Sequence, residues 1–283
     1  MTAPELVAQV KRLTPASHVT VRLIGMLNTP TVDSEDVVGV LKSDSVLTAS
    51  LLRACNSSAL GLKQRVSSVD HAVLLLGYQE ILRLVLSLGL SGSMNAPLPG
   101  YALEAKELWR HSLSTAIAAE VLVSSGLDLP VEAAVAFTVG LLHDFGKTVF
   151  HQVLSADVQA KIRNQIQLEG RSRSEAEKQV LGTDHAEVGA CLLGEWRLHQ
   201  AIVEAVANHH HPVWKQQFGL SVVAHLADCL AHLAGSAPGY DAYAVRVADG
   251  VAEAFGVTPD RLESMVAEVR IASERVEQLM AIT

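Results

Sequence analysis

The sequence predicts an all-α protein. Hydrophobic residues make up 49 % of the 283 residues and recur mostly three to four positions apart, which is the spacing of a buried helix face. Alternation of apolar and polar residues, the sign of a half-buried strand, is nowhere sustained. Aromatic residues are only 4 %, so we expect a core of Leu, Val, Ala and Ile. A chain of this length can bury such a core in one or two domains.

The N-terminal elements follow from local patterns. Residues 19–24 are rich in β-branched side chains but few, and we interpret them as helix. Helical spacing of apolar residues is clear at 51–55 and again at 82–90. The Gly-, Ser-, Asn- and Pro-rich segment 92–100 then predicts a break. We therefore expect an N-terminal helical lobe at residues 1–98 and a second helical lobe at 99–283.

The second lobe continues the helical pattern. Residues 108–120 and 133–142 predict buried helices, and Gly and Pro residues at 126–130 and 235–239 predict loops. Thr258 as N-cap, followed by Pro259 and Asp260, predicts the start of a final helix that runs to near Met280. The apolar positions of this helix could pack on their own domain or on a second copy of the chain.

Charge and cysteine content exclude several classes. The 22 Lys and Arg against 30 Asp and Glu give a net charge of −8, which argues against nucleic-acid binding. Residues 1–12 carry no signal-peptide pattern, and no apolar run approaches the roughly 20 residues that cross a bilayer. Cys55, Cys191 and Cys229 lie far apart in apolar patterns, as expected for reduced core thiols. We expect a cytoplasmic protein without membrane contact.

Histidine is unusually frequent, with 12 residues, of which only His18 and His71 precede the break. Several of the others, with two aspartates, form an ordered series on or at the ends of predicted helices: His111, His143, Asp144, His185, His209, His210 and Asp228. Imidazole and carboxylate together suit divalent Fe, Mn or Zn. Helices that converge could hold one such ion, or two that share Asp144. The alternative is a buried, hydrogen-bonded polar network without metal.

Neighbouring residues could complete this site. Glu107 precedes His111 by four positions on the same helix face and could be a further ligand, or a solvated carboxylate. Lys147 could contact a phosphate oxygen, or be ion-paired, and Gly146 permits a close backbone approach. His225 and His232 flank Asp228 at helical spacing and could support it. His211 could replace one of the paired histidines before it, or cap a helix end.

The order of these residues resembles the HD superfamily of metal-dependent phosphohydrolases, with a spaced His, an adjacent His-Asp pair and a late Asp. Residues 108–112, 140–147, 184–190 and 209–212 further resemble the HDOD family, the HD-related output domain of bacterial signalling proteins. So do Asp44 and residues 51–57 and 69–77. The resemblance covers about residues 15–235. Ser45 stands where the family usually has Pro, at a helix start.

The resemblance implies an HD-type helical lobe, packed on the N-terminal lobe, in a module that acts mostly without catalysis through protein contacts. All seven residues of the ordered series match positions that bind metal in catalytic HD relatives, although many HDOD proteins have lost such ligands. Cyclic di-GMP phosphodiesterases carry a Gly-Tyr-Pro loop shortly after the paired histidines. Here residues 211–219 read HPVWKQQFG, which argues against that activity.

We therefore expect a bacterial signalling output module, non-catalytic or weakly catalytic, that retains a divalent-metal site. Its expected partners are signalling proteins and a phosphate-containing small ligand, and it could form oligomers. The alternative is an active metal-dependent phosphohydrolase that acts on a nucleotide or a phosphomonoester. In that case Asp144 would position a metal-activated water, and Lys147 would neutralise phosphoryl charge.

Overall fold

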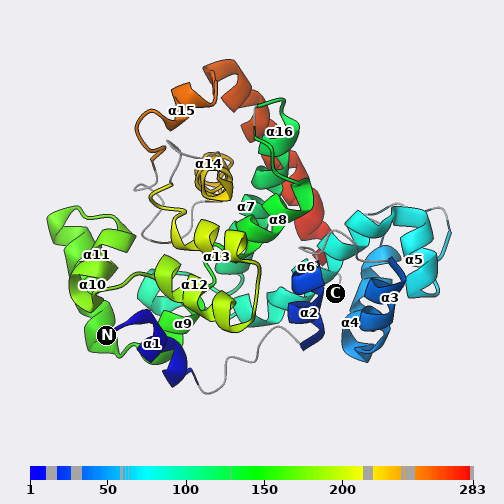
Figure 1. Cartoon of the computed structure of the whole chain (residues 1–283), viewed down its shortest axis with the longest axis horizontal. Helices are drawn as coiled ribbons and strands as arrows, with labels where there is room; N and C mark the ends of the chain where they lie inside the picture. The colour runs from blue at the N-terminus through cyan, green and yellow to red at the C-terminus, as the bar shows by residue number, and fades with distance from the viewer. Residues whose placement is uncertain are drawn as a thin grey trace. The chain divides into compact units, whose positions relative to one another are not determined.

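The computed structural model describes residues 1–10, 18–26, 34–57, 60, 62, 64–127, 129–212, 219–236, 239 and 246–280. Throughout these ranges the regular structure is helical and no strand forms, which confirms the all-α prediction (Figure 1). Residues 213–218, which follow the paired histidines where a Gly-Tyr-Pro loop would be expected, lie outside the described residues. The side chain of His18 also lies outside them. None of the described helices is both long and apolar enough to cross a membrane.

The chain divides into two compact units. The larger unit contains Met1–Leu13 and Met94–Arg270, and the smaller unit contains Thr14–Ser93 and Ile271–Thr283. The sequence predicts a single boundary after residue 98. In the structure the N-terminal segment Met1–Leu13 belongs to the larger unit, and the C-terminal segment Ile271–Thr283 belongs to the smaller unit. The division into two domains at residues 1–98 and 99–283 stays a prediction.

Five helices make up most of the smaller unit. They are α2 (His18–Met26), α3 (Ser34–Lys42), α4 (Ser45–Cys55), α5 (Val69–Leu76) and α6 (Tyr78–Met94). The helical interpretation of residues 19–24 is confirmed by α2. The break predicted at 92–100 is wrong in its first three residues, because α6 continues to Met94. Buried Leu82, Leu86 and Leu90 hold this helix in place, so Gly92 and Ser93 do not end it.

Local polar contacts define both ends of α4. The Asp44 carboxylate accepts hydrogen bonds from the backbone N–H groups of Val46 and Leu47, both at 3.0 Å. Asn56 follows the helix, and its side-chain amide donates to the carbonyl of Val66 and accepts from the N–H of the same residue, both at 2.8 Å. Asp44 therefore caps the helix without the Pro that the family usually has after it.

The larger unit contains the remaining helices, apart from the end of α16. They are α1 (Ala3–Gln9), η1 (Pro99–Tyr101), α7 (Glu107–Ser124), α8 (Ala133–Leu142), α9 (Gly146–Val153), α10 (Ala156–Glu169), α11 (Arg173–Leu181), α12 (His185–Glu195), α13 (Gln200–Ala207), α14 (Leu220–Leu233), α15 (Val251–Ala254) and α16 (Pro259–Met280). Helices α7, α8 and α14 pack on one another, and α9 packs on α12. The final helix begins at Pro259, as the sequence predicts.

Two glycines let these helices approach closely. A Cβ atom on Gly140 of α8 would lie 2.6 Å from the Cα atom of Ala116 on α7. A Cβ atom on Gly146 of α9 would overlap the carbonyl oxygen of His185 and lie 2.7 Å from the nitrogen of Gly189 on α12. The short segment between α8 and α9, which carries His143 and Asp144, is thereby held against the start of α12.

We expect Gly146→Ala to destabilise the protein by about 1–3 kcal/mol, because the added methyl group collides with backbone that cannot move independently. Gly194→Ala is the matched control. Gly194 lies in α12, and beyond its own helix backbone nothing lies within 4 Å of the place a methyl group would take, so alanine should stabilise by about 0.4–1 kcal/mol through helix propensity and chain entropy. Urea denaturation measures both changes, and equal effects of the two substitutions would contradict the close-approach argument.

Candidate metal centre

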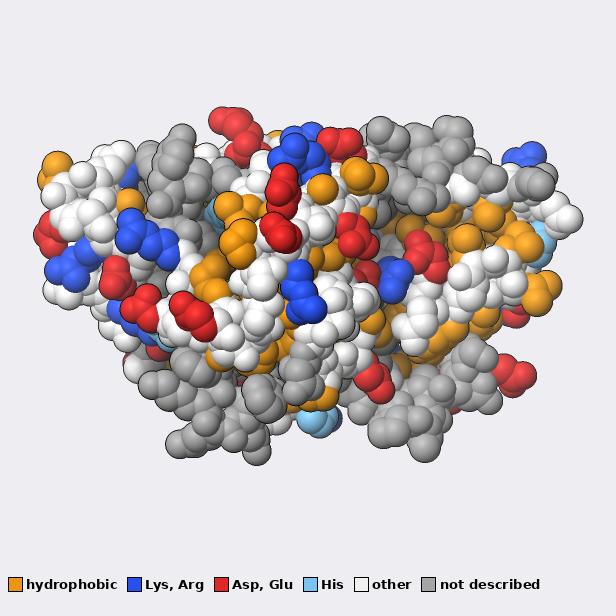
Figure 2. Space-filling model, turned by 90° about the horizontal axis from the view of Figure 1, so that it is seen from above, with side chains coloured by type: hydrophobic (Ala, Val, Ile, Leu, Met, Phe, Trp, Pro, Cys, Tyr) orange, Lys and Arg blue, Asp and Glu red, His pale blue; other side chains and the backbone are white. Residues whose placement is uncertain are grey.

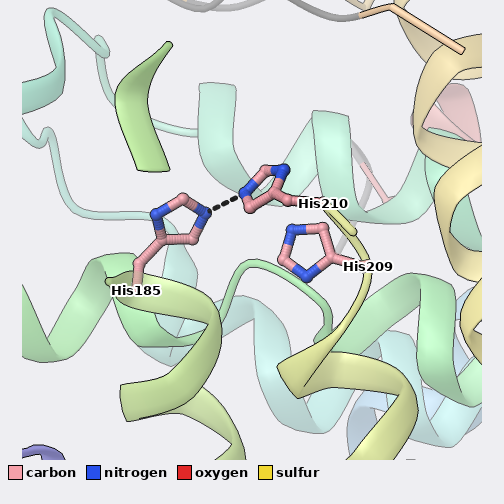
Figure 3. A group of neighbouring side chains, drawn as sticks. All are labelled: His185, His209 and His210. Carbon is pink, nitrogen blue, oxygen red and sulfur yellow. Dashed lines mark hydrogen bonds between the residues drawn. The ribbon is translucent and has the colours of Figure 1, made fainter. Parts of the chain in front are cut away.

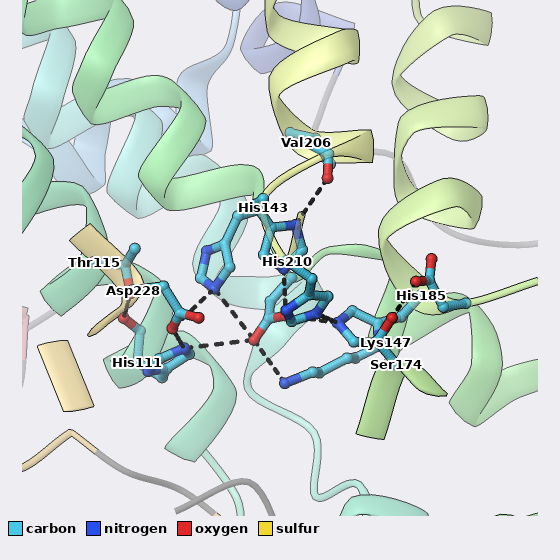
Figure 4. A network of polar contacts seen from close by, with 12 residues as sticks. His111, Thr115, His143, Lys147, Ser174, His185, Val206, His210 and Asp228 are labelled. Atoms are coloured by element: carbon cyan, nitrogen blue, oxygen red, sulfur yellow. Dashed lines mark hydrogen bonds and ion pairs between the residues drawn. The ribbon is translucent and has the colours of Figure 1, made fainter. Parts of the chain in front are cut away.

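The structure brings the seven residues of the ordered series into one cluster of the larger unit (Figure 4). His111 comes from α7, Asp228 from α14 and His185 from the first position of α12. His143 and Asp144 follow α8, and the paired histidines 209 and 210 follow α13. All are buried except His210, which is half-buried. Five helices therefore contribute to a single polar site within the apolar core of the larger unit.

Backbone carbonyls orient three of the imidazole rings. His111, His143 and His209 each place Nδ1 against a carbonyl oxygen. The acceptors belong to Ser236, Gly140 and Val206, at 2.9, 2.7 and 2.8 Å. A carbonyl oxygen only accepts, so Nδ1 donates in each ring and Nε2 is the atom that faces the cluster. This is the arrangement of metal-binding histidines, whose other ring nitrogen donates to a carbonyl or a carboxylate.

The Asp144 carboxylate lies between two groups of imidazoles. Its Oδ2 atom is 3.5 Å from Nε2 of His111 and 3.4 Å from Nε2 of His143. Its Oδ1 atom is 3.3 Å from Nε2 of His185 and 4.0 Å from Nε2 of His209. Two ligand atoms bound to one ion at 2.0–2.1 Å are themselves separated by about 3.0–3.4 Å. Most of these separations are close to that value, with one ligand group on each side of Asp144.

Some buried nitrogen atoms in the cluster have no hydrogen bond. Within the described ranges, Nε2 of His143 and Nε2 of His209 are both buried without one. Such atoms are rare in folded proteins, because each costs the desolvation of a polar group. A divalent ion would satisfy both lone pairs, so the residues present fit a bound metal.

Potential ligand atoms lie within 4.8 Å of one another in three groups. One group contains His111, His143 and Asp144, and another contains His185, His209 and His210. In the second group, Nε2 of His210 is 2.8 Å from Nε2 of His185 (Figure 3). These two groups match the two sides of Asp144. The third group combines His111 and Asp228 with His232, which was not predicted as a ligand.

A buried glutamate that was not predicted from the sequence holds His185. The Oε2 atom of Glu177 on α11 is 2.6 Å from Nδ1 of His185 and accepts its backbone N–H at 2.9 Å. The other carboxylate oxygen accepts from the hydroxyl of Tyr101 at 2.8 Å. Glu177 precedes His185 by eight residues on a different helix, and no spacing rule connects such positions. Its full burial is the signal that identifies it, and only the structure supplies that.

Charge is balanced inside the cluster. Burial alone would raise the pKa of Asp144, but the Lys147 ammonium at 2.8 Å, together with His143, holds that pKa well below its usual value. Burial would likewise lower the pKa of His185, yet the Glu177 carboxylate raises it to about 10. Burial lowers the pKa of His209 to about 3. The Lys147 ammonium and the raised pKa of His185 therefore both place positive charge beside the Asp144 carboxylate.

A cavity of about 160 Å³ adjoins the cluster and is lined by Asp144 and Asp228 among others. Three cationic side chains also line it, Lys147, Arg173 and Arg246. Arg173 is buried, with its guanidinium 4.3 Å from the centre of the Tyr101 ring. Cations around a pocket favour an anionic ligand, and guanidinium and ammonium groups both suit phosphate.

Three further residues singled out in the sequence take different positions. The Glu107 carboxylate accepts the backbone N–H of Glu104 at 2.7 Å and is in none of the ligand groups found among the described residues. His211 lines the cavity but is exposed. His225 lies 2.8 Å from the carbonyl oxygen of His209 through Nδ1 and accepts the N–H of Ala248 at 2.9 Å. It therefore supports the His209 segment rather than Asp228.

The fold and the cluster together define a helical protein with an HD-type histidine and aspartate site. Residues 13–212 match the HDOD domain, and the chain belongs to the HDOD family. The family resemblance inferred from the sequence is thus confirmed.

Relatives share the fold at low sequence identity. A solved HDOD domain protein of unknown function from Geobacter sulfurreducens is 23 % identical, with a TM-score of 0.71, and the match covers 99 % of this chain and 94 % of that one. A candidate signal-transduction protein from Marinobacter aquaeolei VT8 is 21 % identical with a TM-score of 0.76, over 95 % of this chain and 59 % of that one. A candidate phosphohydrolase from Shewanella amazonensis SB2B is 24 % identical with a TM-score of 0.65, over 94 % and 97 %.

An uncharacterized protein from Treponema pallidum (strain Nichols) is 27 % identical over 187 residues, which is 65 % of this chain. The aligned part is 35 % of that protein, so the chain spans about a third of the length of the curated relative it matches. At these identities the solved structures support the fold alone.

We expect Glu177→Gln to weaken metal binding by about 10- to 100-fold, because it removes the charge that orients His185 and raises its basicity. Glu175→Gln is the matched control, since Glu175 lies on the same helix but is exposed and contacts the backbone of Ser172. Competition with a chromophoric chelator measures both affinities. Unchanged affinity in Glu177→Gln would show that this carboxylate does not act on the metal ligands.

Proposed function

We propose that the chain is a signalling output module of the HDOD type that holds a divalent metal in the histidine and aspartate cluster. The observation that carries this proposal is the orientation of the rings. Nδ1 of each of His111, His143 and His209 donates to a backbone carbonyl, which turns Nε2 toward the Asp144 carboxylate, so the ligand atoms are oriented before any ion binds. The module acts by binding rather than by fast catalysis.

The two sides of Asp144 correspond to two ion positions. His111, His143 and Asp228 would hold one ion together with Asp144, and His185, His209 and His210 would hold the other. This donor set of imidazole and carboxylate favours Fe, Mn or Zn.

The cavity beside the cluster receives a phosphate-containing small ligand. Lys147, Arg173 and Arg246 line it, and the metal ligands Asp144 and Asp228 lie at the same wall. A phosphate in this cavity contacts cationic side chains and the ion together. Occupation of the cavity is then the input that the module reports to its partner.

Signalling proteins are the proposed partners. Four large hydrophobic side chains among the described residues of the smaller unit are exposed: Val46 on α4, Leu74 and Leu75 on α5, and Ile271 on α16. Figure 2 shows hydrophobic side chains at the end of the view where α3, α4 and α5 lie in Figure 1, with acidic and basic side chains among them. Exposed apolar residues of this kind are typical of protein contacts. A cytoplasmic location in a bacterium is part of the proposal.

The second candidate function is hydrolysis of a nucleotide or a phosphomonoester. The observation that favours it is the cavity, which places Lys147 and Asp144 beside one another at the candidate ion positions. A bound divalent ion lowers the pKa of water and polarises phosphoryl oxygens. Asp144 would hold that ion, and Lys147 would offset negative charge on the phosphoryl group.

Metal analysis tests the primary proposal. After reconstitution with Fe, Mn or Zn and removal of free ions, we expect the purified protein to retain metal, with lower retention in His209→Ala. His71→Ala is the control, because His71 lies on α5 of the smaller unit, outside the cluster. No retained metal in the unsubstituted protein would refute both candidate functions.

Ligand binding and turnover separate the two candidates. We expect inorganic phosphate to bind the metal-loaded protein in isothermal titration calorimetry, and Lys147→Met to weaken it by about 10- to 100-fold through loss of a charge-assisted hydrogen bond. Lys161→Met, on the exposed face of α10, should have no effect. Rapid turnover of nucleotides or p-nitrophenyl phosphate that Asp144→Asn abolishes would replace the binding role with the hydrolytic one.

A further inference from the structure

The third ligand group extends the cluster along α14. Asp228 and His232 are four residues apart on this helix, so their side chains project from the same face. Nε2 of His232 is 3.3 Å from Oδ1 of Asp228, and its ring centre is 4.8 Å from the ring centre of His111. His232 also lines the cavity beside the cluster. The residue therefore lies at the site, although its helical spacing alone predicts at most a supporting position.

The spacing around Asp228 fits an ion rather than hydrogen bonds alone. Oδ1 of Asp228 is 3.1 Å from Nε2 of His111 and 3.3 Å from Nε2 of His232. Both separations equal the distance of about 3.0–3.4 Å between two ligand atoms of one ion bound at 2.0–2.1 Å. The three side chains surround a position that an ion of the Fe, Mn or Zn class can occupy.

The second nitrogen of His232 gives an independent observation. Nδ1 is buried and makes no hydrogen bond within the described part of the chain. A neutral imidazole has one N–H and one lone pair, so contact with Asp228 through one nitrogen leaves the other unsatisfied. Oδ1 of Asp228, which faces Nε2 of the same ring, is likewise buried without a hydrogen bond within the described ranges. An ion between these two side chains would partner an oxygen atom that hydrogen bonds leave unsatisfied.

We infer that His232 is a ligand of the ion held by His111 and Asp228. The inference rests on the proposed metal-binding function and deepens it. Asp228 and His232 then form a chelating pair from one helix, as two ligands at i and i+4 do in other metal sites. An additional imidazole makes this position richer in nitrogen, which favours Zn and Fe over Mg and Ca.

The test compares His232→Ala with the unsubstituted protein loaded with Co(II), whose visible absorption reports the ligand set. We expect one ion to bind more than about 100-fold more weakly, beyond the 10- to 100-fold effect of residues that only support a ligand. We also expect the Co(II) absorption to change, while the ion held by His185, His209 and His210 stays bound. His71→Ala is the control, and His232→Asn replaces the alanine variant if that variant does not fold.

The outcomes distinguish failure of the inference about His232 from failure of the proposed metal-binding function. Weaker binding with an unchanged Co(II) spectrum makes His232 a positioning residue for Asp228 and overturns the inference. Equal affinity and an equal spectrum in His232→Ala also overturn it, and leave the metal-binding function intact. If the unsubstituted protein binds no metal, the proposed function fails, and the inference fails with it.

Discussion

The structure depends on the burial of the Asp144 carboxylate among imidazole rings. A carboxylate taken out of water is costly unless positive charge and donors surround it. Here Lys147 lies 2.8 Å from one oxygen, and the other faces His185, whose pKa Glu177 raises to about 10. Helices α7, α9, α12 and α14 each bring a residue to this contact or hold the segment that carries it. Several helices of the larger unit thus meet around one buried negative charge, the Asp144 carboxylate.

The supporting hydrogen bonds hold the imidazole rings of the cluster in place. Nδ1 of each of His111, His143 and His209 donates to a backbone carbonyl, which turns Nε2 of these rings toward the cluster. His185 is different, because its Nδ1 is 2.6 Å from the Glu177 carboxylate, which raises its pKa to about 10. Its ring therefore lies between two carboxylates, those of Glu177 and Asp144.

The fold class and the order of cluster residues could be predicted, because each depends on local spacing and on residue type. The contact between Gly146 and α12 was expected as a close approach, but its partner came from the structure. Glu177 could not be predicted, since α11 and α12 meet through tertiary packing that no short pattern encodes. The end of α6 was misplaced for a similar reason: burial of preceding leucines outweighs the helix-breaking tendency of Gly92 and Ser93.

The touching backbones at Gly146 and His185 have a consequence for the spacing of the candidate ligands. Helices in direct backbone contact hold the segment that carries Asp144 beside the first residue of α12, and Oδ1 of Asp144 lies 3.3 Å from Nε2 of His185. A spacing of this size suits transition ions, whose bonds are about 2.0–2.2 Å, better than calcium, which needs more oxygen ligands at about 2.3–2.6 Å. A glycine that is far too small to touch an ion itself thereby helps to set the spacing of the groups that would.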